Sequence, residues 1–134
     1  MSSRNSVSST YTDLSETART ILTTLCNTRD FSEVDRYVSE DVSVQHEDEP
    51  PVASRDAFVR RFSQALEHMP EFSIHIKEAC VDESQLKVWV RSEITGLPGG
   101  LRKESIDMMT FNEEGLLVKS IDCQRVLGRR SDDD

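Results

Sequence analysis

The sequence predicts an α+β domain in which helices cover one face of an antiparallel sheet. Two patterns lead to this fold class. Up to Pro70 the apolar residues recur mainly at helical spacing, and after Pro70 they alternate with polar residues as in strands. Short turn sequences separate the later strand patterns, which favours antiparallel neighbours. At 134 residues the chain has room for one domain with one core and a small pocket.

Three helices are expected in the first half of the chain. The first spans Leu14 to Thr28, where the apolar residues form one stripe. A short second helix is expected from Phe31 to about Val38. The third follows a cap at Ser54 or Asp56 and ends before Pro70, because proline disfavours helical conformation in the residue that precedes it.

Five strands are expected, one before the third helix and four after Pro70. Gly96 to Gly100 and Asn112 to Gly115 supply turns between the later strands. The strand patterns lie at Val42 to His46, Phe72 to Ile76, Leu86 to Ile94, Arg102 to Phe111 and Leu116 to Leu127.

Both ends of the chain have the composition of disordered tails. Residues 1–12 are rich in serine, and residues 128–134 hold two arginines and three aspartates. We therefore expect a single domain at residues 13–127. No apolar run approaches the roughly 20 residues that cross a bilayer, and the start of the chain lacks the apolar centre of a signal peptide. These features predict a cytoplasmic protein without membrane contact.

Charge and cysteine content narrow the classes of partner. The formal net charge of −9 disfavours nucleic acid and anionic membrane surfaces, because an acidic protein repels phosphate. The cysteines, Cys26, Cys80 and Cys123, are odd in number and widely spaced. This spacing fits buried, reduced thiols better than a disulfide framework or a zinc site, so no metal is expected.

Asp107 is the first candidate for a functional residue. It is embedded in an apolar strand pattern that runs from Ile106 to Phe111. If its carboxyl group faces a cavity, poor solvation of the charged form raises the pKa, and the group can act as an acid near neutral pH. The alternative is a carboxylate that faces solvent from the outside of the sheet.

The order of elements and the stretch Ile106-Asp107-Met108-Met109-Thr110-Phe111 resemble the NTF2-like superfamily, which includes ketosteroid isomerases, SnoaL-like polyketide cyclases and limonene-type epoxide hydrolases. The resemblance covers Leu14 to Leu127. It implies a cone with a curved mixed or antiparallel sheet, three N-terminal helices, an enclosed apolar pocket, and a homodimer formed through the sheet. It places Asp107 at the position of the aspartic acid that binds the oxyanion in ketosteroid isomerases.

The resemblance also points to His46 as a base. In the isomerases an aspartate ends the first strand, and His46 stands at that position here. Histidine can accept a proton near neutral pH. The alternative is a strand-end histidine bound to a backbone carbonyl. Leu22 occupies the position of an isomerase tyrosine, which disfavours a true steroid isomerase.

The epoxide hydrolase branch suggests a different pair of residues. That branch uses Arg-x-Asp on one strand and a second aspartate seven residues after the last turn's glycine. The chain offers Arg91-Ser92-Glu93 and, seven residues after Gly115, Asp122. The alternative for Arg91 and Glu93 is an ion pair on the sheet surface.

The predicted function is that of a cofactor-independent acid/base enzyme, an isomerase or cyclase that acts on a hydrophobic polyketide- or terpenoid-like molecule. Two alternatives remain, an epoxide hydrolase of the limonene type and a non-enzymatic module for ligand binding or dimerisation. The predicted catalytic residues are His46, Arg91, Asp107 and Asp122. The predicted substrate-binding residues are Phe62, Trp89, Glu93, Met109 and Phe111.

Overall fold

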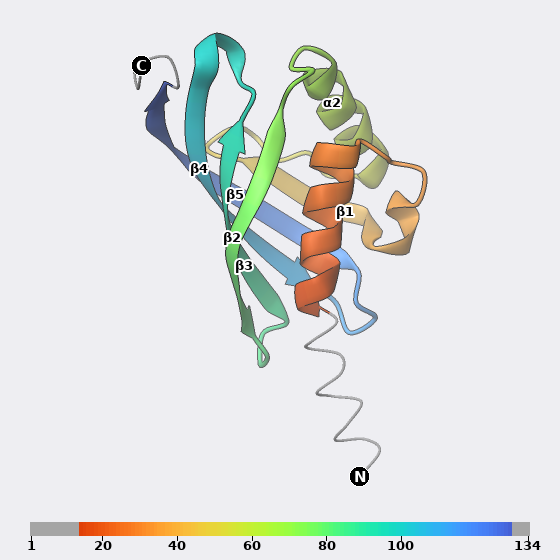
Figure 1. Cartoon of the computed structure of the whole chain (residues 1–134). Helices are drawn as coiled ribbons and strands as arrows, with labels where there is room; N and C mark the ends of the chain where they lie inside the picture. The colour runs from red at the N-terminus through yellow and green to blue at the C-terminus, as the bar shows by residue number, and fades with distance from the viewer. Residues whose placement is uncertain (1–13, 130–134) are drawn as a thin grey trace.

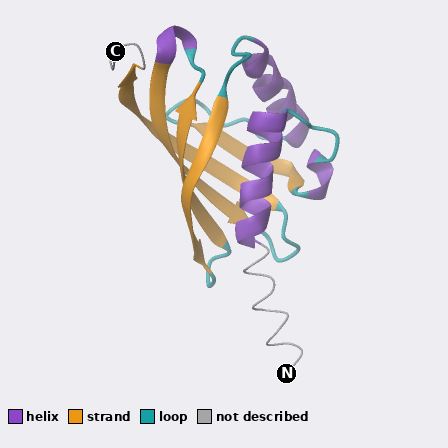
Figure 2. Cartoon of the chain, in the orientation of Figure 1, coloured by secondary structure: helices purple, strands orange, loops and turns teal. Residues whose placement is uncertain are grey.

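The computed structural model describes residues 14–129. Helices cover one face of a curved sheet, as Figures 1 and 2 show. Residues 14–22 are α-helical and continue into the π-helical segment η1. The other elements are η1 (Thr23–Thr28), η2 (Val34–Arg36), β1 (Val38–His46), α2 (Arg55–Glu67), β2 (Ser73–Asp82), β3 (Lys87–Thr95), η3 (Pro98–Gly100), β4 (Leu101–Phe111) and β5 (Leu117–Arg129).

The sheet is mixed, with the strand order β1-β5-β4-β3-β2. The last four strands in sequence form an antiparallel meander, as the short turns predicted. The first strand, β1, instead pairs in parallel with β5, the last. This pairing places His46 beside Asp122, so that the two ends of the domain meet at one edge of the sheet.

The predicted fold class is confirmed, but the second predicted helix is wrong. Only Val34–Arg36 form a short 3₁₀ turn where a helix from Phe31 to Val38 was expected. The chain is already extended at Val38, which pairs with Leu117 of β5, and the Leu117 N–H donates to the Tyr37 carbonyl at 2.8 Å. Pairing with the last strand therefore replaces helical hydrogen bonds at Tyr37 and Val38, and the residues before them form backbone hydrogen bonds between positions three apart.

The end of the first helix is tied to the strand and the loop beside it. Asn27 donates from its side-chain amide to the Ile74 carbonyl at 3.0 Å and accepts from the Ile74 N–H at 2.8 Å. Arg29 follows in the left-handed region with a φ of 63°. Its guanidinium donates to four backbone carbonyls, those of Leu66, Met69, Pro70 and Phe72.

The third predicted helix and the last turn form as their sequences indicate. The Ser54 hydroxyl caps α2 by accepting from the Ala57 N–H at 3.1 Å. In the turn between β4 and β5, Asn112 accepts from two backbone N–H groups through its side chain, and Gly115 has a φ of 84°. Glycine adopts this conformation without strain. The strand β5 continues to Arg129, two residues beyond the predicted limit of the domain.

The main core lies between the first helix and the inner face of the sheet. Within residues 14–129 no helix is long and apolar enough to cross a membrane. The expected N-terminal tail lies outside the described residues. Of the three cysteines, Cys26 is buried as expected, but Cys80 and Cys123 are exposed. The fully or nearly fully buried apolar residues of the main core are Leu14, Ala18, Ile21, Leu25, Val38, Val42, Val88, Val90, Met109, Phe111 and Leu117.

Candidate active site

The inner face of the sheet, the first helix and α2 enclose a cavity of about 440 Å³. This volume lies within the range of about 300–1,000 Å³ that is common for small-molecule sites. Its wall is mostly apolar, with a few polar groups contributed by the sheet. The apolar residues of the wall include Ile21, Leu25, Val44, Phe58, Phe62 and Met109.

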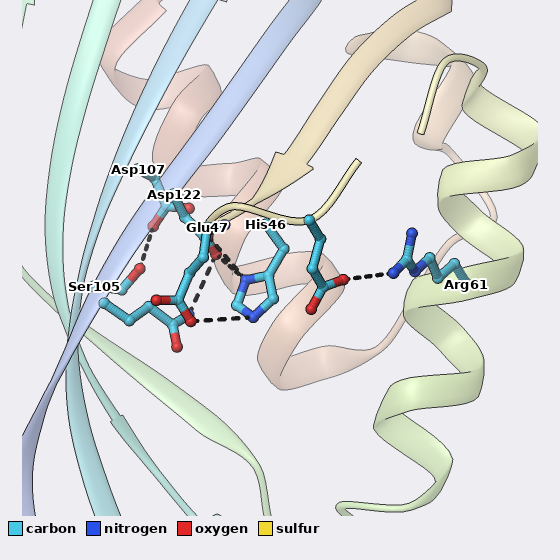
Figure 3. A network of polar contacts seen from close by, with 8 residues as sticks. His46, Glu47, Arg61, Ser105, Asp107 and Asp122 are labelled. Carbon is cyan, nitrogen blue, oxygen red and sulfur yellow. Dashed lines mark hydrogen bonds and ion pairs between the residues drawn. The ribbon is translucent and has the colours of Figure 1, made fainter. Parts of the chain in front are cut away.

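Three ionisable side chains form one row across the sheet inside this cavity. In the strand register Asp107 of β4 pairs with Asp122 of β5, and Asp122 pairs with His46 of β1. Cross-strand partners carry their side chains on the same face of a sheet. Figure 3 shows the three residues in sequence, with Asp122 between the other two. We refer to His46, Asp122 and Asp107 as the acid/base row.

His46 and Asp122 form the tightest contact of this row. The Nδ1 atom of His46 lies 2.9 Å from each carboxylate oxygen of Asp122. The backbone N–H of Glu47 donates to the same carboxylate at 2.8 Å. The hydrogen bond to Asp122 raises the pKa of His46, partial burial opposes this, and the negative charges of Asp122, Glu49 and Glu47 raise it further.

Asp107 lies at the inner end of the row. Burial in the cavity wall raises the pKa of its carboxyl group to about 7, and the negative charge of Asp122 adds to this rise. The Ser105 hydroxyl, which donates to Asp107 over 3.4 Å, and the charge of His46 act in the opposite direction. Near neutral pH this carboxyl group can therefore exist in both protonation states.

His46 lies at the mouth of the cavity, with 46% of its side chain exposed, whereas Asp122 has 19% of its side chain exposed. The acidic loop after β1 borders this mouth. In that loop Glu49 forms an ion pair with Arg61 of α2 (Figure 3). Among residues 14–129 no group of three histidine, cysteine, aspartate or glutamate side chains is placed to hold a metal ion.

The predicted substrate-binding residues lie in three parts of the structure, namely the cavity wall, the main core and the outer face of β3. Met109 and Phe62 line the cavity together with the acid/base row. Phe111 does not line it, because this residue is buried in the main core beyond Met109. The other predicted residues belong to β3.

Trp89, Arg91 and Glu93 lie on the outer face of β3, so the prediction that they reach the pocket is wrong. Trp89 is 50% exposed. Arg91 donates to Glu78 and to Glu104, each at 3.0 Å. The residues that alternate with these three are buried on the inner face, which turns the three outwards.

This placement bears on both alternative functions. In the epoxide hydrolase hypothesis Asp122 activates water and Arg91 holds a carboxylate partner in the site, but Arg91 and Asp122 lie on opposite faces of the sheet. A purely architectural role was expected if Trp89, Met109 and Phe111 filled the interior. Trp89 does not enter the cavity, and a volume of about 440 Å³ remains unfilled by side chains.

Several polar residues of the wall were not predicted as site residues, among them Ser92, Lys103, Ser105 and Gln124. The signal was present in the sequence, because Ser105 and Lys103 precede Asp107 by two and four residues and Gln124 follows Asp122 by two. Residues two apart in a strand share a face. Ser92 and Ser105 are each 1% exposed.

A second depression of about 790 Å³ lies between the end of α2 and the connection from β3 to β4, near Gly96 and Gly99. It is larger and more open than the enclosed cavity. None of the acid/base row reaches it, and for this reason the enclosed cavity is the candidate site.

Comparison with known proteins agrees with this architecture. Residues 18–119 match the model of the SnoaL-like domain. The probable cyclase otaY of Aspergillus carbonarius is 33% identical over 118 residues, which are 88% of this chain and 94% of that protein.

Two solved structures share the fold. A protein from Jannaschia sp. CCS1, assigned as a SnoaL-like polyketide cyclase, superimposes with a TM-score of 0.74 at 12% identity, over 85% of this chain and 86% of its own. A steroid Δ-isomerase from Pseudomonas aeruginosa superimposes with a TM-score of 0.63 at 20% identity, over 85% of this chain and 80% of its own.

Proposed function

The chain belongs to the SnoaL-like domain family, and from that premise we propose that it is a cofactor-independent isomerase or cyclase of a hydrophobic, polyketide-like small molecule. One observation carries this proposal. His46, Asp122 and Asp107 converge from three strands on a single, mostly apolar cavity. Groups that exchange protons near neutral pH are thereby held beside a space for a greasy substrate.

The proposed chemistry is the removal and return of a proton. In a ring closure, a base removes a proton from the carbon next to a carbonyl group, and that carbon then bonds to a second carbonyl carbon. An acid returns a proton to the oxygen of the attacked carbonyl. In an isomerisation, the proton returns instead to another carbon of the same molecule.

His46 is the proposed base. Its Nδ1–H donates to the Asp122 carboxylate, which leaves Nε2 of the neutral ring as the proton acceptor. Asp122 holds the ring in this orientation and stabilises the positive charge that develops on it. The Oε1 atom of Glu47 lies 3.6 Å from Nε2 and favours the protonated ring further.

Asp107 is the proposed hydrogen-bond donor to the oxygen on which negative charge develops. Its raised pKa keeps a proton on the carboxyl group in part of the protein near pH 7. A donor that is already in place stabilises the enolate or alkoxide without reorganisation.

The test is proton exchange at the carbon next to a carbonyl. We expect the protein to accelerate deuterium uptake by 2-tetralone in D₂O, followed by proton NMR. His46→Gln and Asp107→Asn should each lower the rate by about 100-fold or more, the range typical of acid/base and oxyanion groups. Asp41→Asn is the matched control, because Asp41 is an exposed carboxylate of the same strand as His46.

Unchanged exchange in Asp107→Asn would remove Asp107 from the mechanism. Exchange by the wild-type protein no faster than in buffer would count against carbanion chemistry in this cavity. The variant Asp122→Asn separates the roles within the pair. If Asp122 only orients His46, the loss in this variant should be smaller than in His46→Gln.

We also propose that the protein is a homodimer formed through the outer face of the sheet. The register aligns Cys80, Trp89, Met108 and Ile121 in one row across four strands on this face. Charged residues, among them the ion pair of Arg91 with Glu104, lie further along the same strands. An exposed tryptophan amid apolar neighbours and a polar rim is the anatomy of a protein interface.

A further inference from the structure

We infer that the cavity contains a second polar subsite, formed by Ser92, Ser105 and Lys103, that binds a carboxylate group of the substrate. This inference rests on the proposed function, because it names a chemical feature of the molecule that the same cavity would hold.

The subsite lies next to the acid/base row in the strand register. Ser92 of β3 pairs with Ser105 of β4, which pairs with Gln124 of β5. Ser105 is two residues from Asp107, and this spacing corresponds to about 6.7 Å along a strand. Lys103 lies one further step of the same length away, opposite Ile94. Ser92, Ser105 and Lys103 all line the cavity.

The two hydroxyl groups have hydrogen-bonding capacity that the protein does not use. Ser92 is 1% exposed, and its Oγ has no partner among residues 14–129. Ser105 is equally buried, and its contact to Asp107 at 3.4 Å is longer than the usual 2.7–2.8 Å of a hydroxyl hydrogen bond. A buried hydroxyl without a partner is costly, and a bound ligand would remove that cost.

Lys103 gives this part of the cavity a positive charge. In the part of the chain that is described, no carboxylate lies within 4.0 Å of its ammonium group. The other cation of the cavity wall, Arg61, is already paired with Glu49. An uncompensated ammonium group beside an apolar wall, in a protein of net charge −9, attracts an anion.

The donors define the class of ligand. An ammonium group only donates hydrogen bonds, and each serine hydroxyl can donate one, that of Ser105 by turning away from its long contact with Asp107. An oxygen acceptor that carries negative charge satisfies all three, and a carboxylate has two such oxygens. The substrate would therefore present its reacting carbon to the acid/base row and a carboxylate to the subsite, one or two register steps away.

The test compares an acid with its neutral counterpart. The probes are 6-hydroxy-2-naphthoic acid and 6-hydroxy-2-naphthamide, and their dissociation constants are measured by naphthol fluorescence and by calorimetry. We expect the wild-type protein to bind the acid at least about tenfold more tightly than the amide, which corresponds to about 1.4 kcal/mol. Lys103→Met should abolish this preference.

Lys119→Met is the matched control, because Lys119 is an exposed lysine of the neighbouring strand β5, and this variant should keep the preference. Ser92→Ala and Ser105→Ala should each weaken binding of the acid about fivefold, the effect of one hydrogen bond. Circular dichroism of each variant verifies folding. An undiminished preference in Lys103→Met would overturn the inference, and so would equal affinities of the wild-type protein for both probes.

Failure of the subsite is distinguishable from failure of the proposed function. If the wild-type protein exchanges the protons of 2-tetralone but does not prefer the acid, only the subsite is wrong. If it prefers the acid through Lys103 but does not exchange protons, the subsite stands and the catalytic role of the acid/base row fails.

Discussion

Asp107 owes its altered acidity to neighbours that the strand register places beside it. Apolar side chains of the wall deprive its charged form of solvation, and Asp122 adds a negative charge from the next strand. His46 holds its proton more tightly for the opposite reason, since Asp122 stabilises the charged imidazolium. One carboxylate therefore raises the pKa of both partners.

The pH dependence of proton exchange follows from these two shifts. The rate should rise as His46 loses its proton, above its ordinary pKa of 6.5, and fall as Asp107 loses its own near pH 7. We expect a narrow bell-shaped profile whose limbs belong to the coupled row. In Asp107→Asn the alkaline limb should disappear together with most of the rate, because asparagine does not ionise. An unchanged alkaline limb would assign that limb to another group.

The free energy of unfolding should also depend on pH because of the raised pKa of Asp107. The folded state binds the Asp107 proton more tightly than the unfolded chain, so this contribution to stability is complete below pH 3.8 and is lost as the pH rises through about 7. The Asp107→Asn variant does not lose stability in this way, because asparagine does not ionise.

Between pH 4 and pH 8 the free energy of unfolding of Asp107→Asn should therefore rise relative to wild type by on the order of 2 kcal/mol. This is about half of what 1.36 kcal/mol per pH unit would give, because the side chain keeps partial contact with solvent. Urea denaturation at several pH values measures the difference. A difference that does not change with pH would show that Asp107 is not desolvated.

The sequence predicted the position of a site residue correctly where that residue broke an otherwise regular pattern. Asp107 was singled out because a carboxylate interrupts an apolar strand, and it lies in the cavity. Trp89, Arg91 and Glu93 were misplaced because alternation divides a strand into two faces without saying which face the helices cover. The burial of Val88 and Val90 in the same core as the first helix decides that question.

At the level of elements, Arg29 connects the end of the first helix to the segment after α2. Its guanidinium satisfies four carbonyl groups between Leu66 and Phe72 that have no other side-chain donor among the described residues. Met69 and Phe72 of that segment also line the cavity. Arg29 therefore shapes the pocket without lining it.

Replacing Arg29 with glutamine should lower the free energy of unfolding by about 2–4 kcal/mol, because several hydrogen bonds from a charged group are lost. Thermal and urea denaturation measure the change. Arg36→Gln is the control, since Arg36 is exposed and its pair with Glu33 within one turn should contribute under about 1 kcal/mol. Equal losses in the two variants would argue against a structural role for Arg29.

Most elements could be predicted because their signals are local. Strands β2 to β5 follow alternation and turn residues, and α2 follows its cap and apolar stripe. The parallel pairing of β1 with β5 joins distant segments, so no local pattern reports it. The second predicted helix is wrong for a related reason, because its last residues, Tyr37 and Val38, take part in that distant pairing.

At the scale of the whole molecule, the two faces of the sheet differ, with the proposed ligand cavity on the inner face and the proposed dimer interface on the outer face. The outer row that contains Trp89 leaves apolar surface exposed, while the inner face is enclosed by helices. If the outer face joins two copies, its apolar row should be sensitive to charge.

Trp89→Glu should convert the proposed dimer into a monomer, because two buried carboxylates would face each other across a two-fold axis. Light scattering coupled to size-exclusion chromatography gives the mass. Val126→Glu, at a residue that is 60% exposed and outside the apolar row, tests whether any added charge has this effect. A monomeric wild-type protein, or a dimeric Trp89→Glu variant, would contradict the proposed interface.

The neighbouring positions of His46 and Asp122 also determine when the proposed proton-transfer pair can form during synthesis. The two residues are 76 positions apart in the chain, and Asp122 lies in β5, the last strand among the described residues. A nascent chain therefore carries its histidine long before the carboxylate that orients it has been synthesised. The proposed proton transfer by this pair therefore requires β5 to be synthesised and docked beside β1, and a product that terminates before β5 should lack it.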